Sequence, residues 1–134
     1  MSNPIVQDLD HIGVVVPSMD KAVAFWNGIL GFPISEDAKL VGHLRIKFVN
    51  LPSTKIELIE PLDPNCDQAI WLKSHPDGGL HHICFKSEKL SDSSNAMVQK
   101  GIKTCTGVIE LLNGAHIQFF EPKDASGVLI EFIE

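Results

Sequence analysis

Residues 9–16 read LDHIGVVV, and residues 79–85 read GLHHICF. Each stretch places a histidine near the start of an apolar run, which is typical of a buried strand. Each histidine is followed, after a similar interval, by a glutamate inside a second apolar run. Glu57 in TKIELIE lies 46 residues after His11, and Glu131 in GVLIEFIE lies 49 residues after His82. The same pattern of a histidine strand followed by a glutamate strand therefore occurs twice in the chain. This repetition predicts two modules of the same structure.

The repeated residues offer two imidazoles and two carboxylates. Such a set suits a divalent ion of the first transition row, because neutral imidazole and ionised carboxylate satisfy borderline and hard cations together. Side chains alternate between the faces of a strand, so each polar group shares its face with apolar neighbours. An isolated carboxylate is costly in such surroundings, and a bound cation removes that cost. We therefore expect a metal centre with the ligands His11, Glu57, His82 and Glu131.

Structural roles for the same residues remain open. Histidines are common at strand starts, and Glu57 could point to solvent from an alternating strand that also carries Lys55. Recurrence at matched positions in both halves favours ligation over these alternatives. His81 adjoins His82 on the same strand, so the two side chains point to opposite faces and cannot both reach one metal ion. We interpret His81 as a packing residue or as a residue behind the ligands.

Length and composition indicate one globular domain over residues 1–134, with 44% hydrophobic and 21% charged residues. The net charge of −6, with 11 basic and 17 acidic residues, argues against nucleic acid as a partner. Three cysteines, an odd number without CxxC spacing, argue against a disulfide framework. Neither a targeting segment nor a membrane span is expected, so a cytoplasmic location is the prediction.

The first module is expected at about residues 5–62, in the order βαβββ. Ser18 can cap a helix whose apolar stripe ends before Gly31. The expected strands are 9–16, 31–36, 43–51 and 55–60. A linker at about 63–78, rich in proline and glycine, carries a short helical stretch, DQAIWLKSH.

The second module, about 79–134, repeats the order. Ser91 is the expected cap of a helix from about Asp92 to Lys100, and Gly101 is the expected stop. The expected strands are 79–87, 102–110, 115–122 and 127–134. The whole chain is thus predicted to be an α+β fold of two βαβββ modules.

Four segments carry a resemblance to a known family. DHIGVVVPSMDKAVAFWNGILGF (10–32), KIELIEPL (55–62), GLHHICF (79–85) and EPKDASGVLIEFIE (121–134) are similar to the vicinal oxygen chelate superfamily, which includes glyoxalases, bleomycin resistance proteins and dioxygenases. Among its members the chain most resembles the methylmalonyl-CoA epimerases. The resemblance covers nearly the whole chain and implies that the two modules form a cup-shaped mixed sheet. It also implies metal ligands at His11, Glu57, His82 and Glu131, the residues that the repeat singles out.

The resemblance implies a metal-dependent isomerase that removes the α-proton of an acyl-CoA or another thioester, with negative charge on the enolate stabilised by the ion. It implies that Glu131 is both a ligand and an acid/base residue. Co2+ or Mn2+ is favoured, while Zn2+, Ni2+ or Fe2+ also fit the ligands. A homodimer is expected from the resemblance and from exposed sheet edges. Two alternatives stay open: a glyoxalase I-like lactoylglutathione lyase, and a non-catalytic protein that binds a small molecule such as an antibiotic.

The strand VGHLRIKFV departs from the epimerase pattern. The second acid/base carboxylate of those enzymes is expected near Arg45, and this strand contains no Asp or Glu. The residues His43, Arg45 and Lys47 alternate instead with apolar ones, which makes one strand face basic. If that basic face lines the inside of the expected cup-shaped sheet, it could bind an anionic part of the substrate. If it is the outer face of an amphipathic strand, it has no such role.

Overall fold

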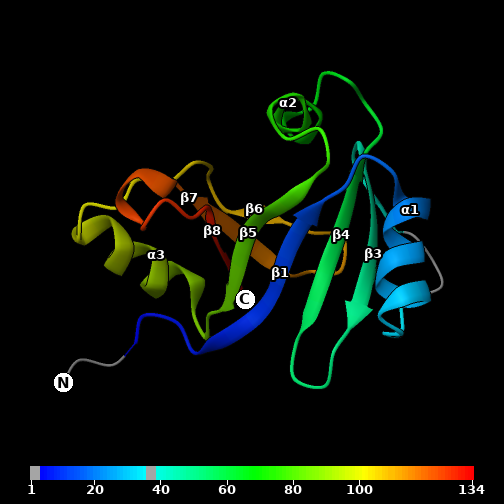
Figure 1. Ribbon diagram of the computed structural model, residues 1–134. Coiled ribbons are helices and arrows are strands. Elements are labelled where there is room, and N and C mark those ends of the chain that lie inside the picture. The colour runs from blue at the N-terminus through cyan, green and yellow to red at the C-terminus, as the bar shows by residue number, and fades with distance from the viewer. Residues whose placement is uncertain (1–3, 36–38) are drawn as a thin grey trace. The chain divides into compact units, whose positions relative to one another are not determined.

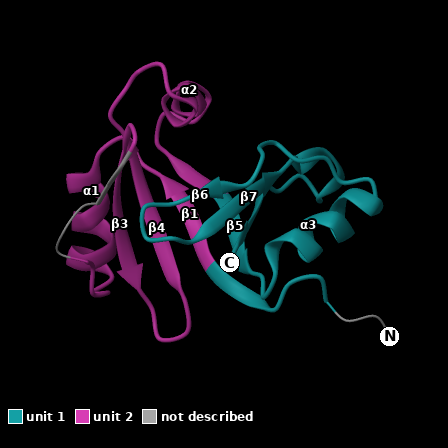
Figure 2. Ribbon diagram, turned by 180° about the vertical axis from the view of Figure 1, so that it is seen from behind, with its two compact units in different colours: residues 1–10, 82–134 teal, residues 11–81 magenta. Residues whose placement is uncertain are grey.

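The structure is a computed structural model that describes residues 4–35 and 39–134. Two compact units divide the chain, as Figure 2 shows: unit 1 comprises Met1–Asp10 and His82–Glu134, and unit 2 comprises His11–His81. The opening residues thus belong with the second module, where the Gln7 backbone N–H donates to the Lys86 carbonyl at 2.9 Å. The segment expected as a linker belongs to unit 2.

Unit 2 has the predicted βαβββ order (Figure 1). Parallel pairing joins β1 to β4, and antiparallel pairing joins β4 to β3 and β3 to β2. A short helix, α2, follows the last strand. The elements are β1 (Asp8–Val15), α1 (Met19–Val23), the π-helical turn η1 (Ala24–Ile29), β2 (Lys39–Val41), β3 (Leu44–Asn50), β4 (Lys55–Pro61) and α2 (Asp67–Ser74).

Unit 1 repeats this order and this pairing. β5 pairs in parallel with β8, β8 pairs antiparallel with β7, and β7 pairs antiparallel with β6. The prediction of two modules with one topology is therefore confirmed. The elements are β5 (Gly79–Lys86), α3 (Leu90–Gln99), β6 (Ile109–Glu110), β7 (His116–Phe120), the 3-10 turn η2 (Pro122–Asp124) and β8 (Ile130–Ile133).

Apolar packing fixes which face of its strands the helix of each module covers. In unit 2, Met19 and Ala22 of α1 pack with Leu58 of β4. On the opposite face of the same strands, Ile59 packs with Trp71 of α2. In unit 1, Leu90 at the start of α3 packs with the buried rings of Phe120 and Phe132. Each module therefore buries one sheet face under its own helix.

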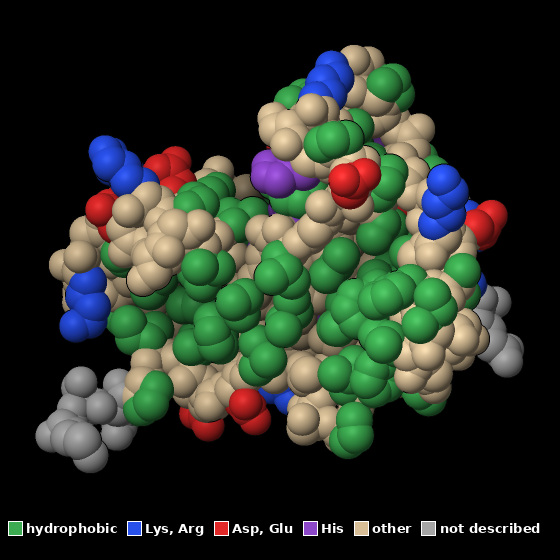
Figure 3. All heavy atoms as spheres, in the orientation of Figure 1, with side chains coloured by type: hydrophobic (Ala, Val, Ile, Leu, Met, Phe, Trp, Pro, Cys, Tyr) green, Lys and Arg blue, Asp and Glu red, His purple; other side chains and the backbone are tan. Residues whose placement is uncertain are grey.

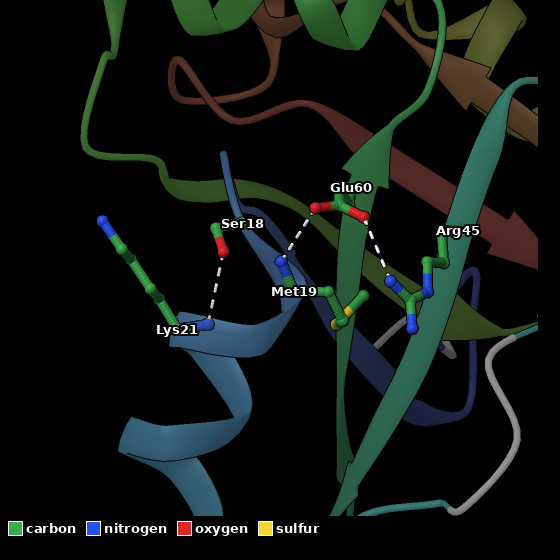
Figure 4. A network of polar contacts seen from close by, with 5 residues as sticks. All are labelled: Ser18, Met19, Lys21, Arg45 and Glu60. Carbon is green, nitrogen blue, oxygen red and sulfur yellow. Dashed lines mark hydrogen bonds and ion pairs between the residues drawn. The ribbon is translucent and has the colours of Figure 1, made fainter.

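A glutamate at the end of the last strand caps the helix of each module. Glu60 accepts a hydrogen bond from the Met19 backbone N–H at 2.9 Å, and its other oxygen lies 3.7 Å from Arg45 Nη1 (Figure 4). Glu134 accepts one from the Leu90 backbone N–H at 2.7 Å. Both carboxylates satisfy an N–H that the helix leaves unpaired and lie at the positive end of the helix dipole.

The two helix starts compare differently with the sequence predictions. Ser18 caps α1 as expected, since its hydroxyl accepts from the Lys21 backbone N–H at 3.3 Å. The predicted cap Ser91 is wrong, because α3 begins at Leu90, two residues before the expected start at Asp92, and Lys89 occupies the cap position. Glu134, which is distant in sequence, performs the capping there, so a local cap is not needed.

Two predicted strands are shorter or displaced. Residues 31–35 form only an isolated bridge between Ile34 and Val49, while Glu36 lies outside the described residues. The second strand of the first module is instead β2, which begins later in the chain, at Lys39. In module 2, the predicted strand 102–110 is reduced to β6 and a bridge between Thr104 and Phe120. Pro33 and Gly107 explain the interruptions, because both residue types weaken a strand.

A close backbone approach makes Gly78 necessary at the entrance to β5. Its φ of +79° lies in the left-handed region, and a Cβ there would be 2.5 Å from the Val15 carbonyl oxygen. Any side chain would therefore be strained and would clash with backbone. The glycine lets the chain return beside the end of β1 within unit 2.

Apolar side chains also remain on the surface of unit 2. Phe25, Ile29 and Leu30 are exposed at and just beyond η1. Figure 3 shows hydrophobic side chains gathered over α1 and the neighbouring strands. Among the helices of the described residues, none has the length and apolar character needed to cross a membrane.

Candidate metal centre

The first histidine and glutamate meet within unit 2. His11 on β1 and Glu57 on β4 place Nε2 and Oε1 3.6 Å apart. The His11 side chain is buried, and that of Glu57 is 15% exposed. Strand alternation puts both residues on the face that carries Ile59, opposite the face that α1 covers. The pair is therefore a polar site set in an apolar surface.

The second pair meets within unit 1. His82 Nε2 on β5 lies 3.1 Å from Glu131 Oε1 on β8, and both side chains are at least nine-tenths buried. The Phe119 ring contacts the imidazole edge to face, with 5.6 Å between ring centroids. Because Phe132 points toward α3, Glu131 points away from that helix. The second pair thus occupies the same side of its module as the first.

The two pairs also share one register. Glu57 lies opposite Gly13, two residues after His11, and Glu131 lies opposite Cys84, two residues after His82. On the other side of each glutamate the neighbouring strand supplies a phenylalanine, Phe48 in module 1 and Phe119 in module 2. The repeat that the sequence predicts is therefore reproduced position by position in each unit. Such matched placement of a nitrogen and an oxygen donor is what a duplicated ligand set requires.

The basic strand residues have a different location. Arg45 and Lys47 share a face of β3 with Val49, which packs beneath α1, and Arg45 pairs with Glu60 there. They therefore lie on the opposite sheet face from Glu57. His43 precedes β3 and is exposed, with Nδ1 3.6 Å from Asp63 Oδ2. This placement supports the outer-face alternative for the strand, and a role of the three residues in substrate binding stays a prediction without structural support.

His81 contributes to an aromatic group at α2. Its ring contacts Trp71 edge to face at 5.4 Å, and Trp71 stacks on His75 at 3.9 Å. These contacts agree with the interpretation of His81 as a packing residue.

Cys66, Cys84 and Cys105 form no disulfide bond within the described residues. Burial, and secondarily the charge of Glu121, raise the pKa of the Cys105 thiol. Cys105 is therefore held in the neutral thiol form, which is the poorly nucleophilic one.

Sequence reasoning missed the two capping glutamates, although a signal for them exists. KIELIE (55–60) and LIEFIE (129–134) align without gaps and place a second glutamate three residues after each predicted ligand. Because the two glutamates are three residues apart, the second one points to the opposite face of the strand from the predicted ligand, which is the face that the helix covers. The same alignment shows that Lys55 and Leu129 occupy one position in the two modules.

Comparisons with known proteins identify the class. The profile of the Glyoxalase/Bleomycin resistance protein/Dioxygenase superfamily matches residues 10–133, and the chain belongs to this superfamily. The fold agrees with a solved structure, Streptomyces coelicolor methylmalonyl-CoA epimerase in complex with 2-nitronate-propionyl-CoA. That match has a TM-score of 0.84 and 25% identity, and covers 96% of each chain.

Curated relatives point to one kind of enzyme within the class. The chain is 36% identical to the human mitochondrial methylmalonyl-CoA epimerase over 92% of its length and 71% of the relative. It is 33% identical to the ethylmalonyl-CoA/methylmalonyl-CoA epimerase of Cereibacter sphaeroides, over 92% of this chain and 94% of that one. The resemblance drawn from the sequence is thus confirmed, and the chain is an epimerase-like enzyme.

Proposed function

We propose that the chain epimerises a 2-substituted malonyl-CoA of the methylmalonyl-CoA kind, with a divalent metal ion bound by His11, Glu57, His82 and Glu131. The observation that carries the proposal is the duplicated pair: each module brings one imidazole nitrogen and one carboxylate oxygen within 3.6 Å or less, at the same register. The epimerase relatives supply the reaction and the substrate class.

The donor set fits such an ion chemically. Two imidazoles and two carboxylates neutralise the charge of a divalent cation and match its preference for nitrogen and oxygen ligands. Their apolar surroundings would strengthen that interaction by excluding water. When bound, the ion stabilises negative charge on the oxygens of the deprotonated substrate. Co2+ and Mn2+ are the metals that we propose.

Glu131 is the residue that we propose to move the proton. Its carboxylate is buried beside the His82 imidazole and the Phe119 ring, so few water molecules compete with a substrate for it. A general base must lie within hydrogen-bond reach of the α-carbon proton, and a carboxylate can take that proton and return it. Epimerisation also requires a second acid/base group on the opposite face of the substrate.

Hydrogen exchange tests the proposed reaction. Protein loaded with Co2+ or Mn2+ should exchange the α-proton of methylmalonyl-CoA for deuterium in heavy water, as followed by nuclear magnetic resonance. The reason is that epimerisation passes through a deprotonated substrate, which takes its new proton from a group that equilibrates with solvent.

Two results would redirect the proposal. Turnover of the glutathione hemithioacetal of methylglyoxal without exchange would indicate the glyoxalase I-like lyase. Tight binding of a small molecule by protein that takes up no metal would indicate the binding protein.

The assembly and location are further parts of the proposal. We propose a homodimer, supported by the resemblance and by exposed apolar side chains such as Phe25 and Ile29. A cytoplasmic location stays a prediction from the sequence.

A further inference from the structure

We infer that Lys55 is the group that binds an anionic part of the substrate beside the metal site. The inference deepens the proposed function, because it names a residue that selects a negatively charged substrate. It rests on the position of Lys55, on how its side chain is held, and on a difference between the modules.

Position is the first observation. Lys55 opens β4 two residues before Glu57, and both residues lie on the sheet face away from α1. Two strand residues span about 6.6 Å. A lysine side chain has the length to deliver its ammonium group to a ligand that reaches Glu57. Lys47, on the neighbouring strand, lies on the other face and has no such access.

An aromatic contact holds the side chain over this face. Lys55 Nζ lies 5.0 Å from the centroid of the Phe48 ring, and Phe48 is the β3 neighbour of Glu57. The attraction between an ammonium group and an aromatic face keeps the stem along the sheet. The ammonium group therefore lies over the sheet face that carries Glu57. Lys55 is partly buried rather than extended into bulk solvent.

The comparison of the modules shows what is particular to Lys55. KIELIE and LIEFIE share both glutamates and both isoleucines, and the phenylalanine beside each predicted ligand is also repeated. At the position of Lys55, however, module 2 has Leu129. A leucine at that register satisfies the fold, so the strand does not need a lysine there. The positive charge of Lys55 is therefore present in module 1 only and is not part of the repeated pattern.

The balance of charges at the proposed metal site explains the effect of the positive charge of Lys55. Two ligand carboxylates balance the formal charge of a divalent ion, so an anionic substrate is attracted by the open coordination positions of the ion and by nearby cationic side chains. A 2-substituted malonyl-CoA carries a free carboxylate and also the phosphates of its carrier. A single lysine beside the ion favours such substrates over neutral thioesters.

Calorimetric binding of two probes tests the inference and separates the two sources of negative charge. Methylmalonate offers carboxylates without the carrier, and coenzyme A offers phosphates without the acyl group. With metal-loaded protein, Lys55→Met is expected to raise the Kd of one probe roughly tenfold to a hundredfold, the usual effect of losing a charged hydrogen bond. Lys55→Arg should restore most of the affinity.

Lys21→Met is the matched control, because Lys21 is an exposed residue of α1. It should leave both dissociation constants unchanged. Metal content and urea unfolding of each variant show that the fold is kept. Equal affinity of Lys55→Met and the wild type for both probes, or failure of both probes to bind the wild type, would overturn the role of Lys55. Failure of the proposed reaction is seen separately, as absence of α-proton exchange in the wild type.

Discussion

Replacing Glu131 by glutamine is expected to lower the rate of α-proton exchange by a factor of about 10² to 10⁴, the usual contribution of a general acid or base. Glutamine keeps the size of the side chain and one oxygen that can bind a metal ion, but it cannot accept the proton. The expected result is therefore a large loss of kcat while much of the metal is retained. Exchange measured by nuclear magnetic resonance, together with metal analysis, gives both quantities.

Glu131→Ala and Glu110→Gln complete this experiment. The alanine variant removes the ligand as well, so it should lose metal in addition to activity, since loss of one ligand from a small set weakens binding strongly. Glu110 on β6 is 71% exposed and should tolerate glutamine without loss. A Glu131→Gln enzyme that keeps more than a tenth of the wild-type rate would contradict the acid/base role.

Replacing Phe120 by alanine is expected to lower the free energy of unfolding by about 3 to 5 kcal/mol, as for other large-to-small changes in a core. Phe120 is fully buried, and its ring centroid lies 4.7 Å from that of Phe132 on β8. The two rings form the centre of the cluster beneath α3. Because β8 also carries Glu131, this packing fixes the strand that presents the proposed base.

Urea unfolding followed by circular dichroism measures this effect. Phe25→Ala is the control, since Phe25 is 45% exposed and lies on η1 of the other unit. Its cost should stay below about 1 kcal/mol. A cost of that small size for Phe120→Ala would show that the cluster of Phe120 and Phe132 does not hold unit 1 together.

The fold was predictable wherever the sequence pattern is local and repeated. The alternation around His11 and the matching runs KIELIE and LIEFIE define strands, and their repetition defines two modules. The start of α3 was not predictable in this way, because its capping group, Glu134, lies 44 residues from Leu90 and only the folded chain brings them together. The displaced strand before β3 was missed because Ile34 makes one bridge where the apolar pattern suggests several.

The candidate site likewise has features that the sequence pattern predicts and features that only the folded chain determines. The histidine and glutamate of each pair could be matched from spacing alone, and both pairs meet in the structure. The role of the basic strand could not be decided from its alternation, since a period of two separates the faces but does not say which face a helix covers. Packing of Val49 beneath α1 answers that question for Arg45 and Lys47. The position of Lys55 over Phe48 likewise depends on the pairing of two strands.

A cobalt titration of the metal-free protein shows whether the two pairs bind one ion together, because the absorbance of bound Co2+ reports both the number of ions and their ligands. Two double variants accompany it, one without His11 and Glu57 and one without His82 and Glu131, all four residues being replaced by alanine. If both pairs hold one ion, the wild type should bind one ion per chain and both double variants should lose tight binding. Tight binding that survives removal of either pair, or two ions per chain in the wild type, would contradict the claim that the duplicated pairs act on a single ion.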